Sequence, residues 1–425
     1  MKAVFSRQKL EGTAQVPSSK SYTIRAIVIA LLSGTRCRID NPLESADTVS
    51  ALYAAEAFGA HIDREDGAWI ITGPAKLVQP KSTVDIGNSG TALYFFASVA
   101  ALLPGKTIFT GDAQTRKRPI IPLLKSLTVL GASCEFLGNP GDTIPVSIQG
   151  PIHGGVTHIT GATSQYMSSL LLTAPYVGED VNIICDNPVE LPYIDMTLEY
   201  MEKAGVSVDR DGYNNFTVAP GRYDAASFTI PADWSSAAFP MICGLLPGSS
   251  VSVCGLDFYD QQGDKKIVEF LESLGAHIEK DESEGTLTVF GDRQLHGAYI
   301  DMKDNPDALP ALTVAASFAT GDTVFANVSG IRQKETDRVL VMQENLQAMG
   351  VSCDSDENTM TVHGTGILHG ADLLSYGDHR IAMALSAAGM FASEITTIED
   401  ADRVSVSFPG FFEMLKKLGA KVRFQ

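Results

Sequence analysis

Hydrophobic and polar positions along this chain form two kinds of block, and the blocks follow one another in a fixed order. Residues 233–246 are almost all apolar or small after an Asp-Trp-Ser-Ser start, which predicts a buried helix. Residues 250–254 alternate as a strand does, and residues 260–274 return to helical spacing. Two further alternating blocks, residues 276–279 and 286–290, predict a pair of strands. The predicted order is helix, strand, helix, strand, strand.

The same order recurs along the whole chain, so the pattern is a repeat. A glycine next to apolar residues ends the second helix of each copy, and these glycines lie roughly 70 residues apart. They are Gly59, Gly131, Gly205, Gly275, Gly350 and Gly419. The first helices of the copies begin near Lys20, Gly90, Ser164, Asp233, Asp307 and His379. We therefore expect six units, three in each of two similar domains.

The first helix of many units is apolar on most of its sides, as in the run Ala-Leu-Thr-Val-Ala-Ala at residues 311–316. A helix without a polar face is stable where protein covers it all round. We therefore expect an α/β fold with helices inside and strands outside, the reverse of a common α/β barrel. A chain of 425 residues is also too long for one simple core, which favours two domains.

The charge of the chain excludes several classes of partner. It carries 50 Asp plus Glu against 32 Lys plus Arg, a formal net charge of −18. Nucleic acid and anionic membranes repel a protein this acidic, so an anionic ligand needs a local basic cluster. The longest apolar run, residues 92–103, is too short to span a membrane, and residues 1–12 do not resemble a signal peptide. Six scattered cysteines without a CxxC pair indicate reduced thiols, and we expect a cytoplasmic protein.

Most starts of the predicted buried helices carry more than capping residues. Capping alone explains Asp233 and the serines after it. It does not explain Lys20, Arg25 or Arg380, because a cation in the first turn faces the positive end of the helix dipole. A bound anion removes that conflict, and the unpaired N–H groups of a helix start attract anions. Several such starts together predict a site for a ligand with several negative charges.

Two further basic segments lie outside the helix starts. Residues 115–120 read Thr-Arg-Lys-Arg-Pro-Ile, and residues 334–338 read Lys-Glu-Thr-Asp-Arg. Lys334 and Arg338 are four residues apart and would share one face of a helix. From these residues alone, surface salt bridges explain the segments as well as ligand binding does.

Together these motifs resemble the 5-enolpyruvylshikimate-3-phosphate (EPSP) synthase family, the 3-phosphoshikimate 1-carboxyvinyltransferases. The resemblance runs in order from residue 12 to Pro409 and covers almost the whole chain. One such motif is a weak indicator, but eight in register with the repeat are a strong one. The motifs are Ser19-Lys20-Ser21 with Arg25, Gly87-Asn88-Ser89-Gly90-Thr91, Arg118-Pro119-Ile120, Ser164-Gln165, Pro192-Tyr193, Pro306-Asp307, Lys334-Glu335-Thr336-Asp337-Arg338 and Asp378-His379-Arg380.

The resemblance implies a two-domain inside-out α/β barrel with three units in each domain, joined by two crossovers. Carried onto this chain, residues 19–231 form an inserted domain, and residues 1–18 return to join residues 232–425 in the other. The active site is then expected in the cleft between the domains. The family reaction moves the enolpyruvyl group of phosphoenolpyruvate to the 5-hydroxyl of shikimate 3-phosphate through a tetrahedral intermediate and releases phosphate.

The resemblance also assigns roles to residues. Asp307 is the expected base for the 5-hydroxyl proton, and Glu335 and Lys20 are candidates for protonating the methylene carbon of phosphoenolpyruvate. The residues implied to bind shikimate 3-phosphate are Lys20, Ser21, Arg25, Thr163, Ser164, Gln165, Tyr193, Asp307 and Lys334. Those implied to bind phosphoenolpyruvate are Lys20, Asn88, Gly90, Thr91, Arg118, Gln165, Glu335, Arg338 and Arg380. The reaction needs no metal or organic cofactor, and we expect small-molecule substrates, no nucleic-acid or membrane partner, and a monomer.

Four positions depart from the family pattern. Tyr94 stands where many members have Arg, Glu190 where some have Ser, Gly330 where some have Asn, and Val406 where many have Lys. One cation expected for phosphoenolpyruvate and two contacts expected for shikimate 3-phosphate are therefore missing. We expect an altered balance of charge in the site, with the reaction retained.

Two other functions compete at this stage. UDP-N-acetylglucosamine enolpyruvyl transferase has the same architecture, but it carries a Lys-Asn start and usually a reactive cysteine in the loop of the second unit. Here the start is Lys20-Ser21, and residues 111–118 contain no cysteine. A non-enzymatic clamp that encircles DNA needs a basic inner face, whereas the predicted inner helices are apolar.

Overall fold

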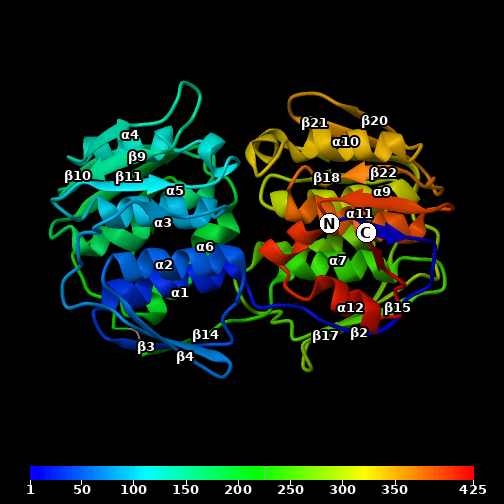
Figure 1. Cartoon of the computed structure of the whole chain (residues 1–425), viewed down its shortest axis with the longest axis horizontal. Coiled ribbons are helices and arrows are strands. Elements are labelled where there is room, and N and C mark those ends of the chain that lie inside the picture. The colour runs from blue at the N-terminus through cyan, green and yellow to red at the C-terminus, as the bar shows by residue number, and fades with distance from the viewer. Residues whose placement is uncertain (225) are drawn as a thin grey trace. The chain divides into compact units, whose positions relative to one another are not determined.

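The computed structural model describes residues 1–224 and 226–425 and divides them into two compact units. Ser18–Ile230 form one of them, called here the continuous unit. Met1–Pro17 and Pro231–Gln425 form the other, called the discontinuous unit. In Figure 1 the continuous unit runs from blue to green, and the discontinuous unit from green to red with the blue N-terminal segment.

The continuous unit contains three repeats of two helices with their strands. Its helices are α1 (Lys20–Ser33), α2 (Ala46–Ala57), α3 (Gly90–Ala100), α4 (Ile121–Val129), α5 (Ser164–Thr173) and α6 (Leu191–Lys203), with short 3-10 turns η1 (Thr115–Lys117) and η2 (Ala174–Tyr176). Its strands are β3 (Arg36–Asp40), β4 (His61–Glu65), β5 (Ala68–Thr72), β6 (Val84–Asp85), β7 (Thr107–Thr110), β8 (Ser133–Phe136), β9 (Val146–Gln149), β10 (Gly155–Thr160), β11 (Val181–Asp186), β12 (Asp209–Asp211), β13 (Asn215–Val218) and β14 (Ser227–Thr229).

The discontinuous unit repeats the same order. Its helices are α7 (Trp234–Gly244), α8 (Ile267–Ser273), α9 (Leu309–Phe318), α10 (Arg338–Ala348), α11 (His379–Phe391) and α12 (Phe411–Lys417), with 3-10 turns η3 (Gly263–Lys266), η4 (Pro306–Ala308), η5 (Ser329–Gln333) and η6 (Ala401–Val406). Its strands are β1 (Ala3–Phe5), β2 (Glu11–Gln15), β15 (Ser250–Cys254), β16 (His277–Asp281), β17 (Thr286–Phe290), β18 (Tyr299–Asp301), β19 (Thr320–Ala326), β20 (Ser352–Ser355), β21 (Thr359–Thr365), β22 (Asp372–Leu374), β23 (Thr396–Glu399) and β24 (Arg423–Phe424).

The strands of the described residues form six sheets of four strands. In the third repeat, β10 leads into the buried helix α5 and pairs in parallel with β11, which leaves it. β13 then pairs antiparallel with β11, and β12 pairs antiparallel with β13. The strand orders are β6-β7-β9-β8, β10-β11-β13-β12, β14-β3-β5-β4, β16-β17-β15-β2, β18-β19-β21-β20 and β22-β23-β1-β24.

Two strands each pair with a sheet of one unit and lead into the first helix of the other unit. We call this the exchange of β2 and β14. β2 leads into α1 of the continuous unit but pairs in parallel with β15 of the discontinuous unit. β14 leads into α7 of the discontinuous unit but pairs in parallel with β3 of the continuous unit. The chain therefore crosses between the units once after Pro17 and once after Ile230.

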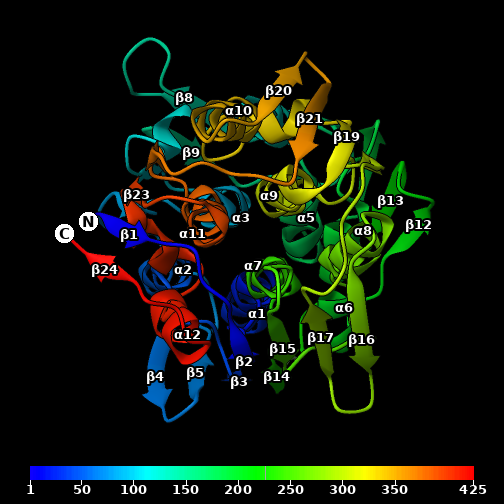
Figure 2. The same cartoon turned by 90° about the vertical axis from the view of Figure 1, so that its right-hand side faces the viewer.

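The first helix of each repeat lies inside its unit. Every residue of α7 and every residue of α9 is buried. α7, α9 and α11 contact one another, and Figure 2 shows them end-on with strands outside them. In the continuous unit α3 contacts both α1 and α5. Each unit has its own hydrophobic core, so the predicted α/β fold with helices inside and strands outside is confirmed.

The sequence-based prediction of the elements misses two details. It omits the strand before each buried helix. Four of these strands, β6, β14, β18 and β22, have only two or three residues, which is too few to show alternation. It also starts the second helix of the fourth repeat at residue 260, whereas η3 starts at Gly263 and α8 at Ile267. Asp260 instead accepts a hydrogen bond from the backbone N–H of Gln262 at 2.9 Å, which stabilises a turn.

Two further expectations concern the helices and the cysteines. Among the described residues, no helix combines the length and apolar character that crossing a membrane requires. The six cysteines have free thiols. Burial raises the pKa of Cys37, Cys243 and Cys353 to about 12, which keeps these thiols protonated and unreactive.

Glycine is required where a repeat passes the end of its buried helix. At Gly150, just after β9, a Cβ atom would lie 1.9 Å from the carbonyl oxygen of Ala101, which follows α3. At Gly291, just after β17, a Cβ atom would lie 1.9 Å from the carbonyl oxygen of Leu246. A backbone oxygen cannot rotate away as a side chain can, so two repeats depend on glycine at the same place.

We predict that Gly150→Ala lowers the free energy of unfolding by about 2 kcal/mol or more, because the added methyl group collides with backbone. Gly330→Ala is the control, since a Cβ atom there would meet nothing within 4 Å. Urea unfolding followed by circular dichroism measures both variants. Equal midpoints for the two variants would show that the repeat accommodates the methyl group.

Candidate active site

The start of α1 brings a lysine against a buried carboxylate. Ser19 caps the helix by accepting a hydrogen bond from the backbone N–H of Tyr22. Lys20, the first helical residue, forms an ion pair with Asp47 in the first turn of α2, with 3.0 Å between Nζ and Oδ2. Both side chains are largely buried, at 14% and 6% exposed. The pair holds the Lys20 ammonium at the start of α1, next to Ser21.

The start of α3 is covered by an arginine. A Cβ atom at Gly90 would lie 2.9 Å from one terminal nitrogen of Arg118, so a side chain at this position would displace the guanidinium group. Asn88 donates from its amide nitrogen to Asp112 and to Gln114, at 2.7 Å each. Thr91 is half-buried in the first turn of the helix.

The start of α5 is capped by a carboxylate from another helix. Glu190 Oε2 accepts hydrogen bonds from the Thr163 hydroxyl at 3.0 Å, the Ser164 backbone N–H at 3.0 Å and the Ser164 hydroxyl at 2.8 Å. Beside it, the side-chain oxygen of Gln165 is buried without a hydrogen-bond partner among the described residues. The tyrosine hydroxyl of Tyr166 donates to the carbonyl of Pro119, which ties this first turn to the residue after Arg118.

Arg25 links three helices of the continuous unit from a buried position. Its guanidinium donates to the Thr197 hydroxyl at 2.8 Å, the Tyr193 carbonyl at 2.8 Å and the Ser168 hydroxyl at 3.3 Å. Among the described residues no carboxylate forms an ion pair with it, and burial lowers its pKa to about 10. The structure therefore joins Arg25 to the backbone of Tyr193, and its predicted contact with a substrate remains a prediction.

Five charged residues meet at the helix starts of the discontinuous unit, and we call them the acid–arginine cluster: Asp307, Glu335, Arg338, Asp378 and Arg380. Arg338 pairs with three carboxylates, at 2.8 Å from Asp378, 2.8 Å from Asp307 and 2.6 Å from Glu335. Arg380 pairs with the second oxygen of Asp307 at 2.9 Å. Asp307 therefore bridges the two arginines, and Arg338 is only 1% exposed.

The cluster sets the protonation of its carboxyl groups. Burial opposes ionisation of Asp307, but the guanidinium groups of Arg380 and Arg338 outweigh it and hold the pKa of Asp307 well below its usual range. Burial also opposes ionisation of Asp378, and Arg338 again lowers the pKa of that carboxyl group. Both groups are therefore carboxylates at neutral pH, and Asp307 is a weak base while both arginines hold it.

The start of α7 contributes more than the capping that the sequence suggests. Asp233 does cap the helix, and its carboxylate accepts hydrogen bonds from the hydroxyls of Ser235 and Ser236. The Ser235 hydroxyl also accepts a hydrogen bond from Arg380 at 2.9 Å. The starts of α7, α9 and α11 therefore meet, because Arg380 contacts both Ser235 and Asp307.

The four positions that depart from the family pattern have different surroundings. Tyr94 is 3% exposed and packs edge-on against Tyr166, with 5.1 Å between ring centroids, so it belongs to the core. Val406 is buried, and Gly330 is exposed. Glu190 forms hydrogen bonds with two predicted site residues, Thr163 and Ser164.

Within each unit, the predicted site residues lie at or near the starts of the buried helices, or on the turns and helices beside them. Lys20, Ser21 and Arg25 lie on α1, and the other members from this unit lie at the starts of α3 and α5, after η1 and on α6. Asp307, Lys334, Glu335, Arg338 and Arg380 lie in the discontinuous unit. Sequence reasoning did not name three partners of these residues as site members, Asp47, Ser235 and Asp378, and it marked Glu190 only as a departure from the family pattern. The position of Asp378, two residues before Arg380, could have indicated its place in the site. No sequence spacing links Asp47 to Lys20.

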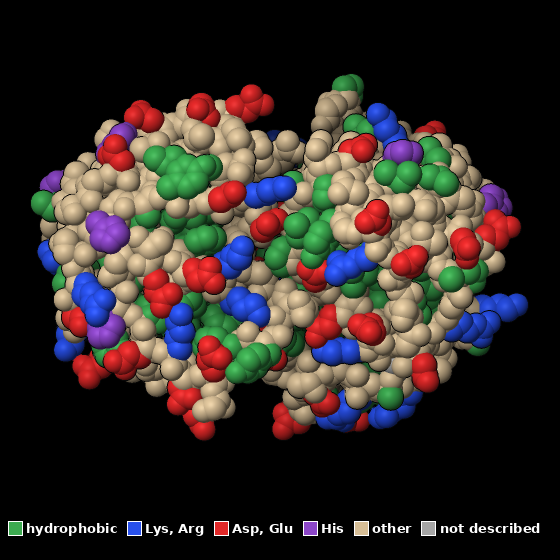
Figure 3. Space-filling view, turned by 180° about the vertical axis from the view of Figure 1, so that it is seen from behind, with side chains coloured by type: hydrophobic (Ala, Val, Ile, Leu, Met, Phe, Trp, Pro, Cys, Tyr) green, Lys and Arg blue, Asp and Glu red, His purple; other side chains and the backbone are tan. Residues whose placement is uncertain are grey.

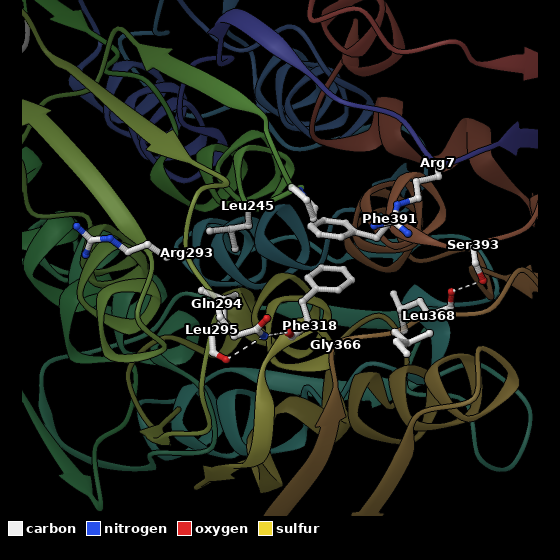
Figure 4. Close-up of a pocket in the computed structure, with 12 residues that line it drawn as sticks. Arg7, Leu245, Arg293, Gln294, Leu295, Phe318, Gly366, Leu368, Phe391 and Ser393 are labelled. Atoms are coloured by element: carbon white, nitrogen blue, oxygen red, sulfur yellow. Dashed lines mark hydrogen bonds between the residues drawn. The ribbon is translucent and has the colours of Figure 1, made fainter.

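A cavity of about 110 Å³ lies elsewhere in the discontinuous unit. Figure 4 shows Phe318 and Phe391 side by side in its wall, with Arg7 and Arg293 at its sides. Phe318 ends α9 and Phe391 ends α11, whereas the acid–arginine cluster lies at the starts of these helices. The cavity is therefore at the opposite helix ends and is not part of the charged site.

The sequence matches the EPSP synthase (3-phosphoshikimate 1-carboxyvinyltransferase) family over residues 4–415. This chain belongs to the EPSP synthase family. A 3-phosphoshikimate 1-carboxyvinyltransferase of Methanocella arvoryzae is 41% identical over 429 residues, which cover 99% of this chain and 100% of the relative. One of Acetivibrio thermocellus is 39% identical over 418 residues, which cover 98% of each.

Solved structures of EPSP synthases have the same fold. An EPSP synthase from Acinetobacter baumannii is 27% identical, has a TM-score of 0.83, and the match covers 100% of this chain and 99% of that one. The enolpyruvyl transferase NikO from Streptomyces tendae has a TM-score of 0.81 at 15% identity and shares the fold alone. The predicted membership of the EPSP synthase family and the predicted fold class are both confirmed.

The lowered pKa values of Asp307 and Asp378 predict how stability depends on pH. An unfolded aspartate titrates near pH 3.9, so between that value and the lower folded pKa the unfolded chain binds more protons. The stabilisation by these groups is therefore complete above about pH 4 to 5 and is lost as pH falls toward the folded pKa. We predict that the urea midpoint decreases below about pH 4, and less so in Asp307→Asn.

Asp209→Asn is the control for that experiment, because Asp209 lies exposed on β12. It should keep the pH dependence of the wild type. If Asp307→Asn and the wild type lose the same stability between pH 6 and pH 3, the two arginines do not stabilise the ionised form of Asp307.

Proposed function

We propose that the helix starts of the two units together form one active site, in a cleft between the units, and that the residues described above carry out the family reaction there. The chain is a transferase that moves the enolpyruvyl group of phosphoenolpyruvate to the 5-hydroxyl of shikimate 3-phosphate. Phosphate is released. The reaction belongs to the shikimate pathway.

In this proposal the continuous unit supplies most of the shikimate 3-phosphate site. The hydroxyls of Thr163 and Ser164, with the backbone N–H of Ser164, are donors suited to a phosphate at the start of α5. Ser21 and Lys20 lie at the start of α1, and Lys334 would add a second cation from the discontinuous unit. The further members are Arg25, Gln165, Tyr193 and Asp307. Arg25 supports the proposal because it is a buried cation without a carboxylate beside it among the described residues.

Phosphoenolpyruvate would bind to arginines from both units. Arg118 over Gly90 offers a guanidinium fork, which suits carboxylate and phosphate oxygens. Arg338 and Arg380 would supply two more, with Asn88, Thr91, Gln165, Glu335 and Lys20 nearby in the proposed site. The missing lysine at Val406 leaves the arginines as the main source of positive charge.

The chemistry requires proton transfer at two places. The 5-hydroxyl oxygen of shikimate 3-phosphate would bond to C2 of phosphoenolpyruvate while Asp307 accepts the hydroxyl proton. In the same step Glu335 or Lys20 would give a proton to C3. The tetrahedral intermediate then loses a C3 proton and its phosphate. Asp307 is a weak base while Arg338 and Arg380 hold it. Anionic phosphoenolpyruvate at these arginines would offset their charge and raise the pKa of Asp307, so the base becomes active when phosphoenolpyruvate binds.

The observation that carries this proposal is the Asp307 carboxylate, which is bound by two arginines at 2.8 Å and 2.9 Å in a chain of this family. The direct experiment is phosphate release from phosphoenolpyruvate with shikimate 3-phosphate as acceptor, with binding of each substrate followed by calorimetry. No phosphate release with this pair would contradict the proposal. Release with UDP-N-acetylglucosamine instead would favour the sister activity.

The proposal needs only one copy of the chain, and we propose a monomer in the cytoplasm. All the residues named above come from the same chain, and six free cysteines suit a reducing compartment. A DNA clamp is disfavoured, because α7, α9 and α11 are buried apolar helices. On the face drawn in Figure 3, acidic and basic side chains are interspersed.

We predict that Asp307→Ala binds each substrate within about tenfold of the wild type but turns over at least about 100-fold more slowly, since it removes the general base. Calorimetry and the initial rate of phosphate release measure the two quantities. Turnover at the wild-type rate would remove Asp307 from its proposed role.

We predict that Gly90→Ala raises the KM for phosphoenolpyruvate about tenfold, because a Cβ atom 2.9 Å from Arg118 shifts the guanidinium group. The KM for shikimate 3-phosphate should change less than about threefold. Gly330→Ala is again the control with open space around it. Equal changes in both KM values would indicate general damage to the unit and not a specific effect on Arg118.

A further inference from the structure

Glu190 occupies an unusual place for the residue that precedes a helix. It is the N-cap residue of α6, yet its side chain forms no capping hydrogen bond to that helix. The carboxylate reaches the start of α5 instead, where one oxygen accepts three hydrogen bonds from Thr163 and Ser164. Glu190 is 5% exposed. A buried carboxylate with three donors at the positive end of a helix is a bound anion that the chain itself supplies.

The backbone holds Glu190 in this position. Its φ angle is +54°, in the left-handed region that residues other than glycine, asparagine and aspartate rarely adopt. Its carbonyl accepts a hydrogen bond from the backbone N–H of Tyr193, and Pro192 fixes the first turn of α6. The turn therefore directs the carboxylate toward α5, and the strain at this residue is offset by the three hydrogen bonds.

We infer that Glu190 is a tethered competitor for the phosphate of shikimate 3-phosphate and sets the affinity of this chain for its acceptor. The inference rests on the proposed function, in which Thr163 and Ser164 bind that phosphate. In the ligand-free protein the Glu190 carboxylate fills the phosphate position, and it leaves when the acceptor binds. It acts on phosphate recognition and takes no part in the chemical steps.

Both the charge of the Glu190 carboxylate and the number of hydrogen-bond donors require that the carboxylate leaves when the phosphate binds. The donors from Thr163 and Ser164 all point at one Glu190 oxygen, so a phosphate cannot use them while the carboxylate stays. Two anions at one helix start also repel each other strongly in a buried place. The displaced side chain stays tethered beside the positive end of α6, which limits the cost of its movement. The carboxylate keeps the donors aligned until the substrate arrives.

The test compares two ligands that differ only in the phosphate. Glu190→Gln removes the charge and keeps the shape of the side chain. We expect calorimetry to show shikimate 3-phosphate binding about tenfold more tightly to Glu190→Gln than to the wild type, whereas the affinity for shikimate stays within about twofold. Glu190→Ser should also bind shikimate 3-phosphate more tightly.

Glu202→Gln is the matched control, because it removes one negative charge from an exposed position of the same helix. It should leave both affinities unchanged. Unchanged or weaker binding of shikimate 3-phosphate to Glu190→Gln would overturn the inference, as would an equal gain for shikimate and its phosphate. If neither the wild type nor Glu190→Gln binds shikimate 3-phosphate, the proposed acceptor fails and the inference fails with it. Binding without phosphate release contradicts only the proposed reaction.

Discussion

The burial of one apolar helix per repeat is the constraint on which the site depends. Such a helix has no face that water can cover, so the strands of its repeat and the neighbouring buried helices must enclose it. In the discontinuous unit this packing brings the starts of α7, α9 and α11 into contact through Ser235, Asp307 and Arg380. Three positive helix ends at one place are unfavourable without negative charge. The carboxylates at these starts follow from the packing before any ligand is considered.

The arginines add charges that the fold alone does not require. Asp378 and Asp307 would satisfy the helix ends without Arg338, yet Arg338 is buried among three carboxylates. Removing an ion pair of this kind from water costs about as much as the pairing returns, so it contributes little net stability. Its consequence is geometric, because each side chain is held at a fixed distance from the next. Preorganised charge of this kind stabilises a reaction without reorganisation when the substrate arrives.

Sequence patterns predict the architecture well because the repeat is regular, and they predict the site less completely. Apolar helices such as α9 are visible as uninterrupted runs, and the motif Gly87-Asn88-Ser89-Gly90-Thr91 marks the start of α3 correctly. The short strand β6 escapes detection because two residues show no period. The pairing of Lys20 with Asp47 escapes for another reason, since it depends on how α1 packs against α2. The contact of Ser235 with Arg380 is not predictable from the sequence, because helix capping already explains a serine at this position.

The sequence also marked Glu190 as a departure without indicating its contacts. An acidic residue in place of serine suggests a lost contact with the phosphate, whereas the structure gives the carboxylate three donors. Its left-handed backbone is not predictable from the residue type, because glutamate rarely adopts it. Strained positions of this kind are found mainly where a structure serves a ligand.

The exchange of β2 and β14 has a consequence for how the protein is made on the ribosome. β2 is synthesised before the continuous unit, but its partner β15 begins only at Ser250, after that unit is complete. The continuous unit, by contrast, is complete once β14 has been synthesised and can pair with β3. During this interval β1 and β2 have no sheet to join, and unpaired strands promote aggregation. The continuous unit can fold while the chain grows, whereas the discontinuous unit can close only after β24 has been synthesised and can pair with β1.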